Sequence, residues 1–271
     1  SDVCSSDLEQ RGVIAKMREH RNFQLLAHAG TGKTRTLLLG CEGKKTLFLE
    51  YNRDLKKEAA EHASKLNITN ITVNNFDGIL TTCYEPNAPY QGFKISMVKV
   101  CQQNTPAICD MNYEVVIVDE AQDIDEIYAA FLLKIIKDAN NPIVILAGDP
   151  KQSIYSYRGA TPSYLLGKRN EFGEKHIMTL NQTHRIPKMI CKLVSSICKP
   201  WFTSDAWISD IDGERVDHKI MILPRSNPIL DAEALKYIEK CLSSIALLVY
   251  SDRPQAKLFC RVVKELSNAN I

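Results

Sequence analysis

The stretch Ala27-His28-Ala29-Gly30-Thr31-Gly32-Lys33-Thr34 decides the fold class of this chain. It follows an apolar run at 23–26, which is typical of a buried strand, and precedes residues 36–39, which are typical of an opening helix. A glycine-rich loop between strand and helix binds phosphate, because its backbone N–H groups converge on the anion and the helix dipole favours negative charge. We therefore expect a phosphate loop, with Lys33 at the outer phosphates and the Thr34 hydroxyl on Mg²⁺.

One position departs from the usual phosphate-loop pattern G-x-x-x-x-G-K-[ST]. Ala27 stands where the first glycine is expected. The alternative interpretation is a chance Gly-Lys-Thr sequence before a helix. The strand–loop–helix context that should accompany the motif is present, so we favour the phosphate loop.

A second site follows the apolar run at 115–118, which is too short for a helix and typical of a central parallel strand. Asp119 and Glu120 come next, and carboxylates at that end of a parallel strand lie beside the phosphate loop. We expect Asp119 to hold Mg²⁺, directly or through water, and Glu120 to orient and deprotonate an attacking water molecule. The simpler explanation is an acidic helix N-terminus, and both can hold at once.

Two further blocks carry polar side chains beyond later strands. In GDPKQSIYSYRGA (148–160), Gln152 can hydrogen-bond a terminal phosphate and respond to its loss. Tyr157 and Arg158 place an aromatic ring beside a cation, which suits stacking on single-stranded bases; interior packing of the tyrosines is the alternative. In LNQTHRIP (180–187), Arg185 can point at a γ-phosphate as an arginine finger, or be a surface residue.

The composition excludes some classes of protein and leaves others open. The chain has 271 residues, a net charge of +2 and 45% hydrophobic residues, enough for the core of one large or two medium domains. The even charge does not by itself indicate nucleic acid, although a local basic groove is compatible with it. No apolar run approaches the roughly 20 residues of a membrane span. Nine scattered cysteines without a Cys-x-x-Cys pair favour free thiols in a reducing compartment over disulfides or zinc.

Strand and helix patterns alternate along the chain, which predicts an α/β fold with a parallel sheet. Strands are expected at 23–29, 46–51, 71–73, 115–119, 143–147 and 176–180, and helices at 10–19, 54–66, 128–137 and 187–197. Residues 82–112 hold three prolines around one short helical patch and are interpreted as a small insertion. Residues 1–8 resemble the translation of a common sequencing adapter, so we expect them to be non-native.

We expect a domain boundary after residue 200, which divides the chain into a first lobe at 9–200 and a remainder at 201–271. The remainder is interpreted as a linker and the truncated start of a second α/β unit. Its expected elements are a strand at 220–223, a helix at 231–241, a strand at 245–250 and a last helix at 253–266.

Together these blocks, in this order, resemble the superfamily-one DNA helicases of the UvrD/Rep/PcrA type, and look closest to their F-box DNA helicase branch. The resemblance covers residues 8–268 and is carried by DEAQD (119–123) followed by GDPKQSIYSYRGA (148–160). It implies a RecA-like P-loop NTPase fold, a parallel sheet with helices on both faces, followed by the truncated start of a second RecA-like lobe. It also implies ATP and Mg²⁺ as cofactors, single-stranded DNA as partner, and tolerance of Ala27.

The same resemblance assigns roles to individual residues. Gln10 matches the glutamine that reads adenine, and His184 stands where an aromatic ring stacks on that base. Gln152 matches the γ-phosphate sensor and Arg185 the arginine finger, so that Lys33, Glu120, Gln152 and Arg185 form the expected catalytic set. Expected nucleotide contacts are Gln10, Ala27, Ala29, Gly30, Thr31, Gly32, Lys33, Thr34, Arg35 and His184. Expected nucleic-acid contacts are Tyr51, Asn52, Phe76, Tyr157 and Arg158.

Two functions from different classes are consistent with these residues. The first is an ATP-driven translocase on single-stranded DNA that separates strands during repair, recombination or replication. The second is a non-catalytic, nucleotide-dependent module that binds single-stranded nucleic acid. We expect a soluble intracellular protein, cytoplasmic or nuclear. The family's later arginine and DNA-backbone motifs do not occur before Ile271, so we expect residues 1–271 alone to bind nucleotide weakly and to hydrolyse it barely.

Overall fold

The computed structural model describes residues 5–19, 22–168, 171–172, 176–188, 190–192, 208–209 and 211. The chain divides into two units, Ser1–Val216 and Asp217–Ile271, and all described residues belong to the first. The elements expected at 220–223, 231–241, 245–250 and 253–266 lie outside the described residues, as do residues 193–197 of the helix expected at 187–197.

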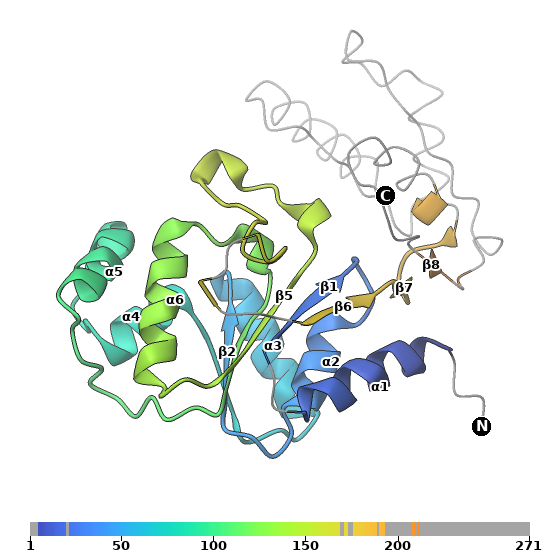
Figure 1. The fold of residues 1–271 in the computed structure, drawn as a ribbon, viewed down its shortest axis with the longest axis horizontal. Coiled ribbons are helices and arrows are strands. Elements are labelled where there is room, and N and C mark those ends of the chain that lie inside the picture. The colour runs from blue at the N-terminus through green and yellow to red at the C-terminus, as the bar shows by residue number, and fades with distance from the viewer. Residues whose placement is uncertain are drawn as a thin grey trace, which may run out of the picture. The chain divides into compact units, whose positions relative to one another are not determined.

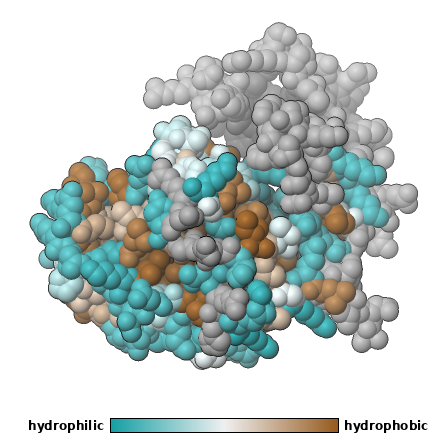
Figure 2. All heavy atoms as spheres, in the orientation of Figure 1, coloured by the Kyte–Doolittle hydropathy of each residue, from teal (hydrophilic) through white to brown (hydrophobic). Residues whose placement is uncertain are grey.

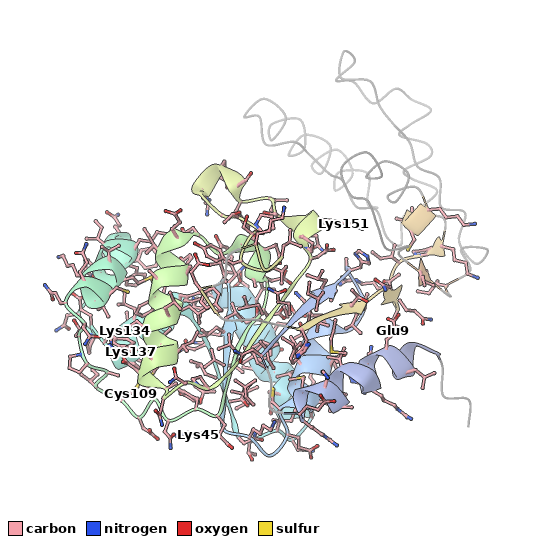
Figure 3. All side chains as sticks on the ribbon, in the orientation of Figure 1. Glu9, Lys45, Cys109, Lys134, Lys137 and Lys151 are labelled. Carbon is pink, nitrogen blue, oxygen red and sulfur yellow. A yellow bond between two sulfur atoms is a disulfide. The ribbon has the colours of Figure 1, made fainter. Side chains whose placement is uncertain are left out.

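A six-stranded parallel sheet in the order β3-β2-β4-β5-β1-β6 forms the centre of this unit (Figure 1). Its strands are β1 (Phe23–Ala27), β2 (Thr46–Glu50), β3 (Ile71–Asn75), β4 (Val115–Val118), β5 (Ile143–Gly148) and β6 (His176–Leu180). Two short strands, β7 (Gln182–Thr183) and β8 (Ile208–Ser209), pair separately. Because the six strands are parallel, all their carboxyl ends lie at one edge. Figure 3 shows Lys151, just past β5, at the opposite end of the sheet from Lys45, just before β2.

In the part of the chain that the structure describes, helices pack on the two faces of this sheet. They are α1 (Ser5–Met17), α2 (Lys33–Gly40), α3 (Arg53–Lys65), α4 (Phe76–Cys83), α5 (Phe93–Gln102) and α6 (Glu126–Asp138). Three of them begin at a side-chain cap, because Asn52, Asn75 and Asp125 each accept a hydrogen bond from a backbone N–H of the first turn. Single-turn 3₁₀ helices lie at Tyr90–Gly92, Ala121–Asp123, Pro150–Gln152 and Ser156–Arg158.

Alternate residues of the central strands supply two hydrophobic cores. On one face Leu47, Leu49, Val116 and Val118 pack with α4, α5 and α6, and on the other face Phe48 packs with α1, α2 and α3. Figure 1 shows the two groups of helices on opposite sides of the sheet. Burial on both faces explains why β2 and β4 are nearly continuous apolar runs. The predicted α/β class with helices on both faces is therefore confirmed.

Some predicted boundaries differ from the observed ones. Helix α1 begins at Ser5, inside the segment expected to be non-native, since no proline or glycine at 5–8 stops it. Strand β3 continues to Asn75, where the Asn75 side chain caps α4, a helix that was not predicted. The insertion at 82–112 contains α5, which packs against α6.

The expectation that the cysteines are free thiols is wrong for one pair. Cys83, at the end of α4, and Cys109, after α5, form a disulfide with their Cα atoms 5.1 Å apart. Figure 3 marks Cys109 at the end of the sheet that also holds Lys45. The two cysteines are 26 positions apart in sequence and come together only through the path of the insertion, so spacing alone could not reveal the pair. Cys41, Cys101 and Cys191 are free.

The surface view in Figure 2 shows apolar residues as separate patches among polar ones. The most exposed large apolar side chains include Tyr90, Ile95 and Ile108 of the insertion, and Tyr157 of the loop after β5. Among the described residues, no helix combines the length and apolar character that a bilayer-spanning helix requires.

The double-sided core makes a prediction about stability. Phe48 is fully buried in the middle of β2, so Phe48→Ala should lower the free energy of unfolding by about 3–5 kcal/mol, through lost burial and the cavity left behind. Tyr90→Ala is the matched control, because Tyr90 is 85% exposed and should change that free energy by less than about 0.5 kcal/mol. Urea denaturation followed by circular dichroism measures both. Equal losses in the two variants would contradict the assignment of Phe48 to the core.

Candidate functional site

A cleft of about 410 Å³ opens at the carboxyl edge of the sheet. Its wall contains the whole stretch 27–35 together with Glu50, Asp119, Glu120, Gln152, His184 and Arg185. Residues from five separate parts of the sequence therefore meet in one place. The parallel sheet explains this, because β1, β2, β4, β5 and β6 all end at the same edge.

Two glycines allow the loop after β1 to turn. Gly30 and Gly32 have φ values of 75° and 78°, in the left-handed region that side chains disfavour. A Cβ atom on Gly30 would lie 2.6 Å from Thr183 Oγ1, so no side chain fits there. Ala27, by contrast, is the last residue of β1 and has no positive φ. Alanine is therefore tolerated at the first position of the phosphate-loop motif.

Lys33 lies between two carboxylates inside the cleft. Its Nζ atom is 2.6 Å from Asp119 Oδ1 and donates to Glu120 Oε1 at 2.7 Å, while Thr34 Oγ1 donates to Asp119 Oδ2 at 2.9 Å. Burial disfavours charge on Lys33, but the two carboxylates outweigh it and hold the pKa of the ammonium above its ordinary value. Burial also acts to raise the pKa of Glu120, yet the Lys33 ammonium holds that pKa below its ordinary value. Lys33 and Glu120 are therefore both charged, and a bound phosphate would compete with the carboxylates for Lys33.

Glu120 has an unusual backbone conformation. Its φ and ψ angles of 52° and 40° lie in the left-handed region, which few residues other than glycine adopt. Such conformations cost energy and concentrate at functional sites. Here the turn directs the Glu120 carboxyl group back towards Lys33, 2.7 Å away, rather than along the direction of β4.

A chain of hydrogen bonds connects Glu120 to Gln152. Gln122 Nε2 donates to Glu120 Oε2 at 2.6 Å, and Gln122 Oε1 accepts from the Asp149 backbone N–H at 3.1 Å. Asp149 Oδ2 in turn accepts from Gln152 Nε2 at 2.9 Å and lies 3.7 Å from His28 Nδ1 of the phosphate loop. The loop after β5 is thus connected, through side chains, to both the phosphate loop and the carboxylates after β4.

Gln10 and His184 lie at one end of the phosphate loop. Gln10 Nε2 donates to the Thr31 carbonyl oxygen at 3.0 Å and is 3.4 Å from His184 Nε2. The backbone N–H of His184 donates to the Gly30 carbonyl oxygen at 2.8 Å. The preceding residue, Glu9, anchors α1 here by accepting hydrogen bonds from the backbone N–H groups of residues 181 and 182 (Figure 3). Both side chains therefore lie beside the phosphate loop, and their contact with an adenine base stays a prediction. Arg185 is exposed and lines the same cleft.

A second group of side chains lies after β2 and β5. The rings of Tyr51 and Tyr155 stack with centroids 5.3 Å apart, Tyr155 and Tyr157 are 6.2 Å apart, and the Arg158 guanidinium lies 5.3 Å from both of the latter rings. Tyr157 is 73% exposed. The exposure of Tyr157 argues against the interior-packing alternative for that residue. The Tyr155 ring contacts the rings of both Tyr157 and Tyr51.

Two expected nucleic-acid contacts, Phe76 and Asn52, have structural roles, which exclude the expected contact for Phe76 alone; Asn52 is exposed and its contact stays a prediction. Phe76 is 2% exposed and stacks on Tyr128 with ring centroids 4.8 Å apart. The Phe76 ring therefore has no free face on which a base could stack. The Asn52 side chain caps α3 by accepting from the Leu55 backbone N–H at 2.9 Å. The expectation that Phe76 contacts nucleic acid is wrong, because helix α4 turns its ring inward. The oxygen of the Asn52 side chain is occupied by the cap of α3.

Glu50 is a cleft residue that the sequence reasoning missed. It ends β2, is 3% exposed and lines the cleft. Burial and the nearby Asp119 carboxylate raise the pKa of Glu50 to about 9. The sequence feature that identified Asp119, a carboxylate at the end of an apolar strand, is also present at Glu50.

The residues beside Lys33 fit a magnesium ion of the kind that nucleotides carry. Among the described residues there is no group of three or more histidine, cysteine, aspartate or glutamate side chains that could form a complete metal cage. Magnesium at nucleotide sites does not need one, since it takes one or two protein oxygens, phosphate oxygens and water. The Thr34 hydroxyl and the Asp119 carboxylate, 2.9 Å apart, supply such oxygens, and a buried oxygen of Glu50 is left without a hydrogen-bond partner among the residues described.

Comparison with known proteins shows that part of this chain is similar to a helicase domain. A family model for the UvrD/REP helicase N-terminal domain matches residues 43–173, which include Asp119, Glu120 and Gln152. The chain is 29% identical over 121 residues to an ATP-dependent helicase/nuclease subunit from Natranaerobius thermophilus, covering 43% of this chain and 9% of that protein. It is 28% identical over 141 residues to a probable DNA helicase II homolog of Mycoplasma capricolum, covering 49% of this chain and 19% of that protein.

Two further relatives extend the comparison. The ATP-dependent DNA helicase srs2 of Schizosaccharomyces pombe is 35% identical over 89 residues, covering 33% of this chain and 10% of that protein. The crystal structure of Pif1 helicase from Candida albicans aligns with a TM-score of 0.46 and 13% identity over 70% of this chain and 43% of that chain, too distant to carry weight. The chain thus spans less than a fifth of the length of the curated relatives named here. Residues 43–173 thus match the UvrD/REP helicase N-terminal domain, and Lys33 and Arg185, which lie outside that range, line the same cleft as the matched residues.

Proposed function

We propose that this chain is the ATP-binding lobe of an ATP-dependent helicase that moves on single-stranded DNA and separates strands. The observation that carries the proposal is the single cleft in which Lys33, Asp119, Glu120, Gln152 and Arg185 meet. Each of these side chains has a role in phosphoryl transfer, and their wide separation in sequence argues against a chance meeting. This proposal includes the activity of the longer protein, its DNA partner and a second lobe that begins in residues 201–271.

The cleft suggests how ATP would be bound and hydrolysed. The phosphates would take Lys33 away from Asp119 and Glu120, which now hold it at 2.6 and 2.7 Å. Asp119 and Thr34 would hold Mg²⁺, which supplies positive charge to the phosphate oxygens. Glu120, released from Lys33, could then orient an attacking water molecule and accept its proton. Gln152 and Arg185, which line the same cleft, would face the terminal phosphate.

The aromatic residues after β5 suggest where DNA binds. Exposed Tyr157, which lies beside Arg158 and Tyr155, offers a ring face and a cation, the combination that binds single-stranded bases without sequence preference. Gln152 and Tyr157 belong to the same loop, so loss of the terminal phosphate could alter the position of the DNA-binding rings.

A non-catalytic nucleotide-dependent binding module is the second candidate. No single observation favours it, and the expected catalytic set of Lys33, Glu120, Gln152 and Arg185 lines the cleft. Turnover by a protein with both lobes separates the two functions.

Lys33→Ala should weaken binding of Mg·ATP by about 10- to 100-fold. The variant loses charge-assisted hydrogen bonds worth about 1.5–3 kcal/mol and leaves Asp119 and Glu120 facing the phosphates unpaired. Binding of a fluorescent ATP analogue measures the effect. Lys57→Ala removes the same charge from an exposed side chain and serves as control. Affinity in Lys33→Ala equal to that of the control would refute the phosphate-loop assignment.

Glu120→Gln should keep Mg·ATP bound and lower the hydrolysis rate by about 10²–10⁴, because the amide cannot accept the proton of the attacking water. Steady-state turnover should be measured with single-stranded DNA, in a polypeptide extended through the proposed second lobe. Glu42→Gln, at an exposed position, controls for the loss of one carboxylate. Unchanged turnover in Glu120→Gln would move the general base elsewhere, and absent turnover in the unmodified protein would favour the non-catalytic module.

Tyr157→Ala should weaken binding of an oligothymidine by about 1–3 kcal/mol while ATP affinity stays the same. The ring is 73% exposed, so its loss should leave the melting temperature nearly unchanged. Tyr90→Ala, which removes another exposed tyrosine, should leave DNA binding intact. Fluorescence anisotropy measures both. A fall in melting temperature with unaltered DNA affinity would instead indicate a structural role.

A further inference from the structure

Glu50 is an acidic residue in the cleft with an unsatisfied atom. Its side chain is more than nine-tenths buried, with 3% exposed, and its Oε2 atom makes no hydrogen bond to any residue that the structure describes. A buried acceptor left without a donor costs free energy, and such atoms are rare in folded proteins. Because Glu50 lines the cleft, a bound ligand could supply the missing donor.

The position of Glu50 follows from strand pairing. Strand β2 lies beside β4, with Leu49 opposite Val118, and the Asp119 N–H donates to the Leu49 carbonyl oxygen at 2.9 Å. Glu50 and Asp119 are therefore the next residues along two adjacent parallel strands, at the carboxyl edge. Two carboxyl groups at neighbouring strand ends repel each other when both are charged, which is unfavourable unless a cation lies nearby.

The Lys33 ammonium in the cleft is already engaged. It is bonded to Asp119 and Glu120, at 2.6 and 2.7 Å. A ligand that satisfies Glu50 should thus bring its own hydrogen-bond donors, and a positive charge on that ligand would favour the ionised form of the carboxyl group. Hydrated Mg²⁺ provides both, because it keeps several of its water molecules when it binds with nucleotide phosphates.

We propose that Glu50 is an additional positioning residue of the magnesium–nucleotide site, where its carboxyl group accepts a hydrogen bond from water bound to the metal. The inference rests on the proposed function, since it requires Mg·nucleotide in this cleft. Asp119 and Thr34 remain the residues that hold the ion, and Glu50 acts on it through water. A residue of this kind orients the hydration shell and raises the affinity for the metal.

The test separates metal affinity from nucleotide affinity. Binding of a fluorescent ADP analogue to residues 1–271 is followed while Mg²⁺ is increased from a chelated solution, and Mn²⁺ binding is followed directly by electron paramagnetic resonance. Glu50→Gln should raise the Mg²⁺ and Mn²⁺ concentrations at half-saturation by about 10-fold, the effect typical of losing a group that hydrogen-bonds a metal ligand. ADP affinity without metal should stay the same. Glu50→Asp, which keeps the charge, should recover part of the loss.

Glu58→Gln is the matched control, because Glu58 also lines the cleft but is exposed. An equal shift in Glu58→Gln and Glu50→Gln would overturn the inference, since it would show only a general effect of negative charge. So would an unshifted metal requirement in Glu50→Gln, or a lower ADP affinity without metal. If the unmodified chain fails to bind ADP at every Mg²⁺ concentration, the proposed function itself fails, and the inference about Glu50 fails with it.

Discussion

The ion pairs of Lys33 connect two parts of the sheet that are not adjacent. Lys33 begins α2 after the β1 loop, Asp119 and Glu120 follow β4, and β5 lies between β1 and β4 in the sheet. A buried ammonium without a partner would cost several kcal/mol, so this contact keeps the phosphate loop and the two carboxylates in register. The same contact affects ligand binding, because a phosphate must interact with the Lys33 ammonium at least as strongly as the two carboxylates do. The cleft is therefore best described as a site in which the Lys33 charge is already balanced by neighbouring acids.

A second connection follows from the first. Glu120, which one bond holds to Lys33, is joined through Gln122 and Asp149 to Gln152. The same loop continues to Tyr155, Tyr157 and Arg158, whose rings and guanidinium lie together beside Tyr51. If Lys33 changed its partner, the change could therefore alter each hydrogen bond from Glu120 to Gln152. This arrangement gives a physical route by which the occupancy of the cleft could influence the exposed aromatic surface.

The parts of the fold that could be predicted were those with a strong local signal. Strands β2, β4 and β5 are apolar because the sheet is buried on both faces, and β6 was predicted with its observed limits. The phosphate-loop residues, Asp119, Glu120, Gln152 and Arg185 were identified from their positions after strands and His184 from the family resemblance, and they meet in one cleft. Helix α4 was missed because its first turn depends on the Asn75 cap, and the Cys83–Cys109 disulfide because it depends on the tertiary path of the insertion. Phe76 shows the remaining gap, since the sequence does not tell that the first residue of α4 turns its ring into the core.

The most direct test of this account is a crystal structure of the chain with Mg·ADP. The account predicts the phosphates in the cleft, with Lys33 Nζ moved from Asp119 and Glu120 to a phosphate oxygen and the Glu120 carboxyl group released. The account would be contradicted by a structure in which Lys33 keeps both carboxylates as partners while the nucleotide lies elsewhere on the molecule.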